Sequence, residues 1–131
     1  MLHFQTNHTH GAGNALQACV ATILGTAHLE DVPNATEDSR GYLVALTEFL
    51  ACKQPAMGFV KVPCVEGKLP LPMSSGIRCV FAGKSPRGEH RHCCVGIVLN
   101  DGVSIELSHD PHSEGLGIDG PALWVGFICL R

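Results

Sequence analysis

The chain has 131 residues, of which 45% are hydrophobic and 16% charged, so we expect it to fold rather than stay disordered. This length supports one hydrophobic core but not two, and it predicts a single domain over residues 1–131. The net charge is −3 and the Lys and Arg residues are scattered, which argues against a nucleic-acid polymer or an anionic membrane as the main partner.

The N-terminus has no charged-then-apolar leader, and no apolar run approaches the ~18 residues of a membrane span, so a cytoplasmic protein is expected. Seven cysteines are present without a CxxC pair, and most of them lie in apolar runs. We interpret them as reduced thiols that pack as small hydrophobic side chains, not as a disulfide framework or a structural zinc site.

Helix signals are confined to the first half of the chain. A first helix is predicted over residues 15–24, where apolar residues recur at four-residue spacing, with Asn14 as its N-cap and Gly25 as its C-cap. A second helix is predicted over residues 39–53, and Gly41 weakens its first turn.

After residue 54 the pattern changes to short β-type runs separated by Gly, Pro and Ser. Strands are predicted over residues 58–63, 77–82, 92–99, 103–108 and 123–130, with a loop over residues 66–76. Helices followed by a run of strands are typical of an α+β domain, with N-terminal helices packed on an antiparallel sheet.

One turn signal brings two polar side chains together. Asp101-Gly102 lies between two β-type runs and favours a two-residue type I′ hairpin turn. Counting back from that turn sets His92 opposite Pro111, so His92 and Asp110 should be neighbours at the open end of the hairpin. A slip of one or two residues would keep the two side chains within reach.

An imidazole that is oriented by a carboxylate is the general-base half of a nucleophilic triad. The favoured place for the nucleophile is a helix N-terminus, because the helix dipole and the free N–H groups lower the pKa of a thiol there. The first predicted helix begins at Ala15, which is not a nucleophile. Cys19 lies one turn further on the apolar face, where its thiol should be buried and inert.

The stretch over residues 13–21, Gly-Asn-Ala-Leu-Gln-Ala-Cys-Val-Ala, resembles the nucleophile helix of small papain-like cysteine-peptidase-fold proteins of phages and bacteria. Those proteins read Gly-Asn-Cys-Leu-Gln-Ala here, followed by a short apolar helix and an acidic-Val-Pro turn, which is residues 31–33 in this chain. The segments around Gln5, His92 and Asp110 resemble the segments that carry the other catalytic groups of the family, in the papain order.

The resemblance implies a papain-like fold and a Cys-His-Asp hydrolase, in which a cysteine at position 15 attacks a carbonyl carbon. His92 would be the general base, Asp110 would orient it, and Gln5 with the N–H of residue 15 would hold the oxyanion. The expected outcome is cleavage of an amide, isopeptide or ester bond, or acyl transfer, on a peptide or small-molecule substrate, without a cofactor. We expect Asn14, Cys93 and His109 to line the substrate site, and Arg87 to be solvated.

Ala15 stands where the family has its cysteine, and we interpret it as an engineered Cys-to-Ala change. A natural loss would instead make the chain a papain-fold binding protein that does not cleave. A further variant is a phage anti-defence enzyme that acts on a nucleotide-derived signal molecule in the host cytoplasm.

A metal enzyme is the third hypothesis, because eight histidines are many for this length. The pairs His8 with His10, His90 with His92 and His109 with His112 could supply imidazole ligands. The chain lacks an HExxH or zinc-deaminase signature, so no metal is expected. A homo-oligomer is compatible with this sequence.

Overall fold

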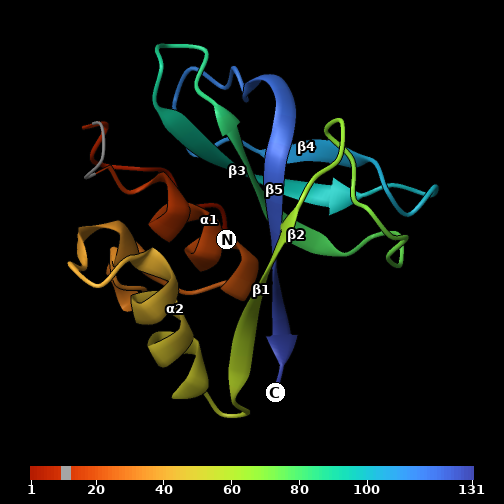
Figure 1. The fold of residues 1–131 in the computed structure, drawn as a ribbon. Helices are drawn as coiled ribbons and strands as arrows, with labels where there is room; N and C mark the ends of the chain where they lie inside the picture. Colours follow the sequence, from red (N-terminus) through yellow and green to blue (C-terminus); the bar gives the residue numbers. More distant parts are fainter. Residues whose placement is uncertain (10–12) are drawn as a thin grey trace.

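The computed structural model describes residues 1–9 and 13–131, and it forms an α+β domain (Figure 1). The helices come first in the chain and the strands follow, as the sequence predicts. The α-helices are α1 (Ala15–Leu24) and α2 (Tyr42–Ala51), and two short 3-10 helices, η1 (Leu29–Asp31) and η2 (Ala35–Glu37), lie between them. The strands are β1 (Met57–Pro63), β2 (Arg78–Lys84), β3 (Arg91–Val98), β4 (Ile105–His109) and β5 (Asp119–Leu130).

The five strands form one antiparallel sheet in the order β1-β5-β2-β3-β4. The last strand in the chain, β5, therefore lies between β1 and β2 and joins the edge strand β1 to the rest of the sheet. Figure 1 shows both α-helices on one side of the sheet, with α2 beside β1. None of the helices in the described part of the chain is long and apolar enough to cross a membrane.

Alternating side chains of the sheet build two buried clusters. One lies between the helices and the sheet, and its buried members are Leu16, Cys19, Val20, Ala21, Val32, Ala35, Leu46, Leu50, Val80, Ala82, Val95 and Trp124. The other lies on the opposite face, and its buried members are Leu69, Cys79, Phe81, Cys94, Val98, Val125 and Phe127. Successive residues of a strand point to opposite faces, so Cys93 and Cys94 belong to different clusters.

The first helix has the bounds that its sequence predicts. It ends at Gly25, whose φ of 68° places it in the left-handed region that glycine adopts without steric cost. Asn14 occupies the N-cap position, but its side-chain oxygen accepts hydrogen bonds from Thr6 and Asn7 instead of capping the helix. The second helix is shorter than predicted and begins only at Tyr42, because Gly41 has a φ of 99° and is not helical.

The turn between β3 and β4 differs from the predicted type I′ turn. That turn needs a positive φ at both central residues, yet only Gly102 has one among the loop residues, at 78°. The Asp101 carboxylate accepts hydrogen bonds from the N–H groups of Val103 and Ser104, at 3.0 and 2.8 Å, which holds a wider loop.

Gly126 of β5 provides a direct test of the packing between the helices and the sheet. A Cβ atom at this position would overlap the ring of Phe59 from β1. We expect Gly126→Ala to lower the free energy of unfolding by about 1–3 kcal/mol, the usual cost of overpacking a core. Urea denaturation measures it. The matched control is Gly58→Ala on β1, where the nearest atom is the flexible Arg131 side chain at 3.4 Å; it should change stability by less than about 0.5 kcal/mol. Equal losses in the two variants would contradict this description of the core.

Candidate active site

His92 and Asp110 meet at the open end of the β3–β4 hairpin. His92 Nε2 lies 2.7 Å from Asp110 Oδ1, and the two side chains are 3% and 2% exposed. An ionised carboxylate can only accept a hydrogen bond, so Nε2 carries the proton and donates it. The predicted neighbourhood is therefore present.

The register at this end is one residue different from the predicted one. A bulge between Val95 and Gly96 pairs Val95 with His109, whereas the register nearer the turn pairs Gly96 with Leu107. This extra residue on the β4 side moves Pro111 out of the position opposite His92. The side chain of Asp110 still reaches the imidazole.

The Asp110 carboxylate is kept ionised by its hydrogen bonds. Burial would raise its pKa, but hydrogen bonds from His92 and from the N–H groups of His112 and Gly117 outweigh it and set the pKa at about 2. The two backbone bonds measure 2.9 and 2.7 Å. A fixed carboxylate behind His92 holds the imidazole in one orientation and one tautomer.

Cys94 is the third group at this position. Its sulfur lies within 4.8 Å of His92 and Asp110 ligand atoms, and among the described residues this trio is the one set spaced to hold a metal ion. Burial and the charge of Asp110 raise the pKa of the Cys94 thiol, so it stays protonated at neutral pH. Because Asp110 already accepts from His92 and two backbone N–H groups, we interpret the trio as a hydrogen-bonded dyad with a packed thiol.

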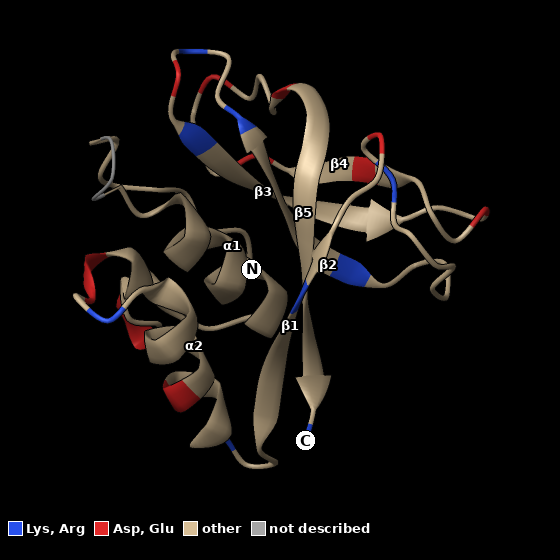
Figure 2. Ribbon diagram, viewed as in Figure 1, with Lys and Arg blue, Asp and Glu red and all other residues tan. Residues whose placement is uncertain are grey.

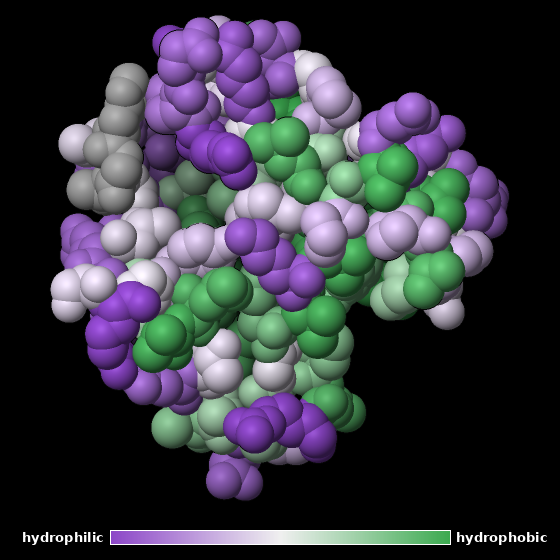
Figure 3. Space-filling view, viewed as in Figure 1, coloured by the Kyte–Doolittle hydropathy of each residue, from purple (hydrophilic) through white to green (hydrophobic). Residues whose placement is uncertain are grey.

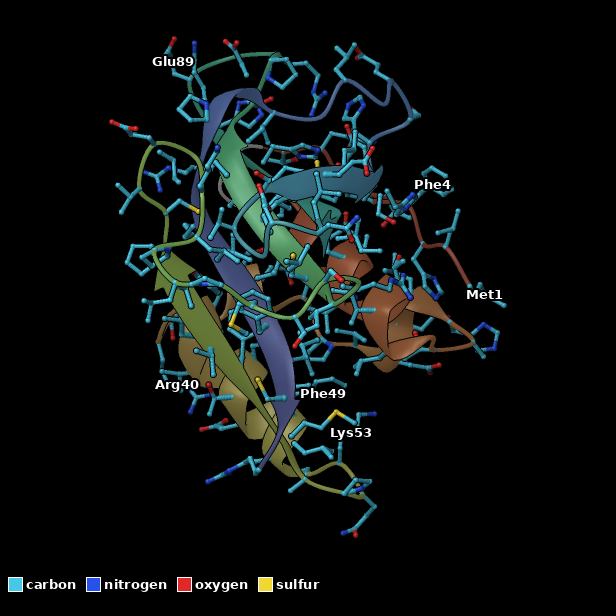
Figure 4. All side chains as sticks on the ribbon, turned by 90° about the vertical axis from the view of Figure 1, so that its right-hand side faces the viewer. Met1, Phe4, Arg40, Phe49, Lys53 and Glu89 are labelled. Atoms are coloured by element: carbon cyan, nitrogen blue, oxygen red, sulfur yellow. The ribbon has the colours of Figure 1, made fainter. Side chains whose placement is uncertain are left out.

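Within residues 1–9 and 13–131, the histidines considered for a metal are not spaced to hold one ion together. His109 Nε2 donates to the backbone carbonyl of His3 at 2.6 Å and its ring packs edge-on against Phe4. Figure 4 shows Phe4 at the end of β4. His10 lies outside the described residues.

The segment before α1 is held between the helix and the residues that follow β4. Asn14 Oδ1 accepts hydrogen bonds from the N–H groups of Thr6 and Asn7, both at 2.9 Å, and Asn14 Nδ2 donates to Thr6 Oγ1. The N–H of Gln5 donates to the carbonyl of Pro111 at 3.0 Å. These contacts place Gln5 between the start of α1 and the loop that carries Asp110.

A cavity of about 530 Å³ opens where these segments meet. Its described lining residues are Gln5, His8, Thr9, Gly13, Ala15, Leu16, Thr36, Tyr42, Lys61, Ala82, Arg87, His90, Arg91, His92, Cys93, His112 and Trp124. Figure 3 shows the surface hollowed here, below the hairpin that joins β2 and β3. The volume is in the range of small-molecule sites.

Four of the residues expected at the site line this cavity, namely Gln5, Ala15, His92 and Cys93. Asp110 lies behind His92. The described lining residues do not include Asn14 or His109, which were also expected at the site. Asn14 turns its side chain toward the N-terminal segment, and His109 is bound to the backbone of His3. Both are buried residues with structural contacts.

The existing thiols near the site are not activated. Cys93 is the one cysteine among the described lining residues, and burial raises its pKa to about 12, although Lys61 nearby acts in the opposite direction. Cys19 is fully buried, and its pKa is also raised by burial, as its place inside α1 predicts. A reactive thiolate at this cavity would therefore have to come from position 15.

The sequence pattern missed several lining residues. Arg87 was expected in solvent, but it lies in the wall, and Nη1 is buried without a hydrogen-bond partner among the described residues. Tyr42, Lys61 and Trp124 come from α2, β1 and β5, and only the order of the strands in the sheet brings them together. Nothing in local spacing indicates this.

Comparisons with protein-family models, with curated proteins and with solved structures give no match to this chain. The similarity to papain-like proteins therefore stays a prediction.

The charge of Asp110 predicts a pH window for stability. Its pKa is about 2 in the folded protein, below the unfolded value of about 3.9, so its contribution is fully present above pH about 4 and is lost as the pH falls through about 2. We expect Asp110→Asn to lower the free energy of unfolding at pH 7 by about 2 kcal/mol. The difference from the parent chain should shrink between pH 4 and pH 2.

Urea denaturation of both chains across this pH range measures the effect. Asp119→Asn is the control. The Asp119 side chain is 60% exposed, and its Oδ2 forms a surface ion pair with Lys84 Nζ at 3.5 Å. This variant should change stability little, because a solvent-exposed ion pair contributes little. A constant difference between Asp110→Asn and the parent from pH 7 to pH 2 would contradict the ionised dyad.

Proposed function

We propose that this fold is that of a papain-like cysteine hydrolase whose nucleophile position, residue 15, is occupied by alanine. The observation that supports it most is the placement of His92, bound to Asp110 at 2.7 Å, and the first residue of α1 on the walls of one cavity. A buried carboxylate-imidazole pair that shares a cavity with a helix N-terminus is an arrangement that can activate a thiol nucleophile.

With cysteine at position 15, the catalytic steps follow from these positions. The N-terminal N–H groups of α1 and the helix dipole favour the thiolate. Because Nε2 of His92 is engaged with Asp110, Nδ1 is the nitrogen that takes the thiol proton. The thiolate attacks the carbonyl carbon, His92 returns the proton to the leaving group, and water then cleaves the acyl-enzyme.

The oxyanion would be held by two donors from different segments. One is the backbone N–H of residue 15, which lies in the first turn of α1 and has no intrahelical partner. The other is the Gln5 side chain. Its Nε2 donates one hydrogen to Asn7 O at 3.1 Å and has a second hydrogen to offer. Donors fixed in advance are worth the most when charge develops.

A binding protein that retains this fold without turnover is the second candidate function. It is favoured by the alanine itself, since the cavity of about 530 Å³ is formed with alanine at position 15. In this reading Ala15 is native, and the bound molecule is a peptide or a small metabolite. An enzyme that acts on a nucleotide-derived signal would use the same cavity with cysteine at position 15.

The deciding variant is Ala15→Cys, labelled briefly with iodoacetamide at pH 6 and read by intact mass and peptide mapping. Ordinary thiols with a pKa of about 8.5 are mostly protonated at this pH and react slowly. We expect one fast adduct at position 15, formed at least about tenfold faster than at the exposed Cys52 and Cys129.

Two controls separate the possible causes of fast labelling. Adding His92→Ala should slow the reaction of the thiol introduced at position 15 to the rate of an ordinary thiol. Leu43→Cys places a thiol in the first turn of α2, without the His92–Asp110 pair, and measures the effect of a helix N-terminus alone. Labelling of Ala15→Cys no faster than that of Leu43→Cys would reject the hydrolase and favour the binding protein.

A further inference from the structure

The wall of the cavity is positively charged although the chain as a whole is not. Lys61, Arg87 and Arg91 line it together with four histidines, and none of the described lining residues is an Asp or a Glu. The net charge of the chain is −3. Figure 2 shows blue segments on the hairpin between β2 and β3, next to the hollow in Figure 3.

The acidic groups near this wall contact residues other than its Lys and Arg side chains, and Glu114 Oε1 lies 4.0 Å from His112 Nε2. Glu89 at the hairpin tip is 95% exposed, lies 3.5 Å from Lys84 and points outward in Figure 4. Asp110 is bound to His92. Arg87, Arg91 and Lys61 form no ion pair with any residue in the described part of the chain. Three permanent cations therefore line one cavity without an ion-pair partner of their own among the described residues.

Three side-chain polar atoms of the wall are buried without a hydrogen-bond partner among the described residues: the acceptor Gln5 Oε1, and two that can donate. The two donors are Arg87 Nη1 and Tyr42 Oη. Leaving a buried donor unpaired is costly, more so when it is charged. Burial, and after it the charge of Arg87, lowers the pKa of His112. The ring of His8 lies 4.6 Å from that of His112. An anion with several acceptor oxygens could accept hydrogen bonds from Arg87 Nη1 and Tyr42 Oη at the same time.

A flat aromatic surface adjoins the cations. Tyr42 stacks on Trp124 with an interplanar angle of 15° and 6.1 Å between ring centroids. Lys61 Nζ lies 4.9 Å from the centroid of Trp124 and 5.3 Å from that of Tyr42. The rings hold the ammonium group at the cavity wall by cation–π attraction, so it is positioned before a ligand arrives.

We propose that this cavity binds a small organic molecule that carries a compact group with at least two negative charges, a phosphate or a polycarboxylate, held by Arg87 and Lys61. A guanidinium matches the oxygens of either group with a two-pronged hydrogen bond. The inference deepens the proposed function, because it names the substrate class of the same cavity. Binding itself needs no thiol at position 15, so it can be tested on the chain as it stands.

Trp124 makes the test direct, because it is the single tryptophan of the chain and lines the cavity. Its fluorescence is followed at pH 7 while pyrophosphate, citrate, adenosine 5′-monophosphate or adenosine is added, with NaCl at matched ionic strength as the blank. We expect saturable changes with at least one anionic probe and none with adenosine. Comparing the affinity for pyrophosphate with that for citrate shows whether the cavity recognises phosphate or carboxylate groups.

Matched variants locate the bound probe. Arg87→Ala and Lys61→Ala should each weaken binding at least tenfold, and Arg87→Lys, which keeps the charge but loses the planar fork, should weaken it less than Arg87→Ala. Lys53→Ala removes a cation that lies over Phe49, away from the hairpin in Figure 4, and should leave binding unchanged. Thermal unfolding of each variant checks that it is folded.

Failure of this inference differs from failure of the proposed hydrolase. Equal losses in Arg87→Ala and Lys53→Ala, no saturable change with any anionic probe, or binding of adenosine alone would each overturn it. Fast labelling of Ala15→Cys together with such a result would retain the hydrolase with an uncharged substrate. Anion binding without fast labelling would retain the charged ligand in a protein that does not turn it over.

Discussion

The Asp110 carboxylate must remain ionised although its side chain is almost completely buried, and much of the site depends on how this is achieved. Its oxygens accept from His92 and from the backbone of His112 and Gly117, which fixes both the imidazole and the loop after β4. In that loop, the carbonyl oxygen of Pro111 accepts a hydrogen bond from the N–H of Gln5. One buried charge thus organises three separate segments around the cavity.

The parts of the fold that the sequence predicts are those with local causes. The bounds of α1 follow from its apolar spacing and from Gly25, which ends a helix by its own backbone preference. The hairpin turn was predicted wrongly because a side chain intervened. Asp101 binds the backbone of Val103 and Ser104, and this local bond outweighs the tight turn that Asp-Gly usually favours.

The one part of the candidate site that the sequence could predict is the His92–Asp110 pair, because a single hairpin carries both residues. His92 and Asp110 are brought together by strand pairing, and a one-residue bulge did not separate them. Side-chain direction is a different matter, since Asn14 and His109 lie close to the site in sequence but point into backbone contacts. The cationic wall needs the completed order of strands, which spacing along the chain does not encode.

The contact between His3 and His109 joins residues 106 positions apart. His3 is also bound to the other end of α1, because its N–H donates to Thr22 Oγ1 at 2.9 Å and its ring lies 2.7 Å from Thr26 O. The N-terminal segment therefore links α1 to the end of β4. Shortening the chain by its first three residues would disturb the positions of both elements around the cavity, although it removes none of the described lining residues.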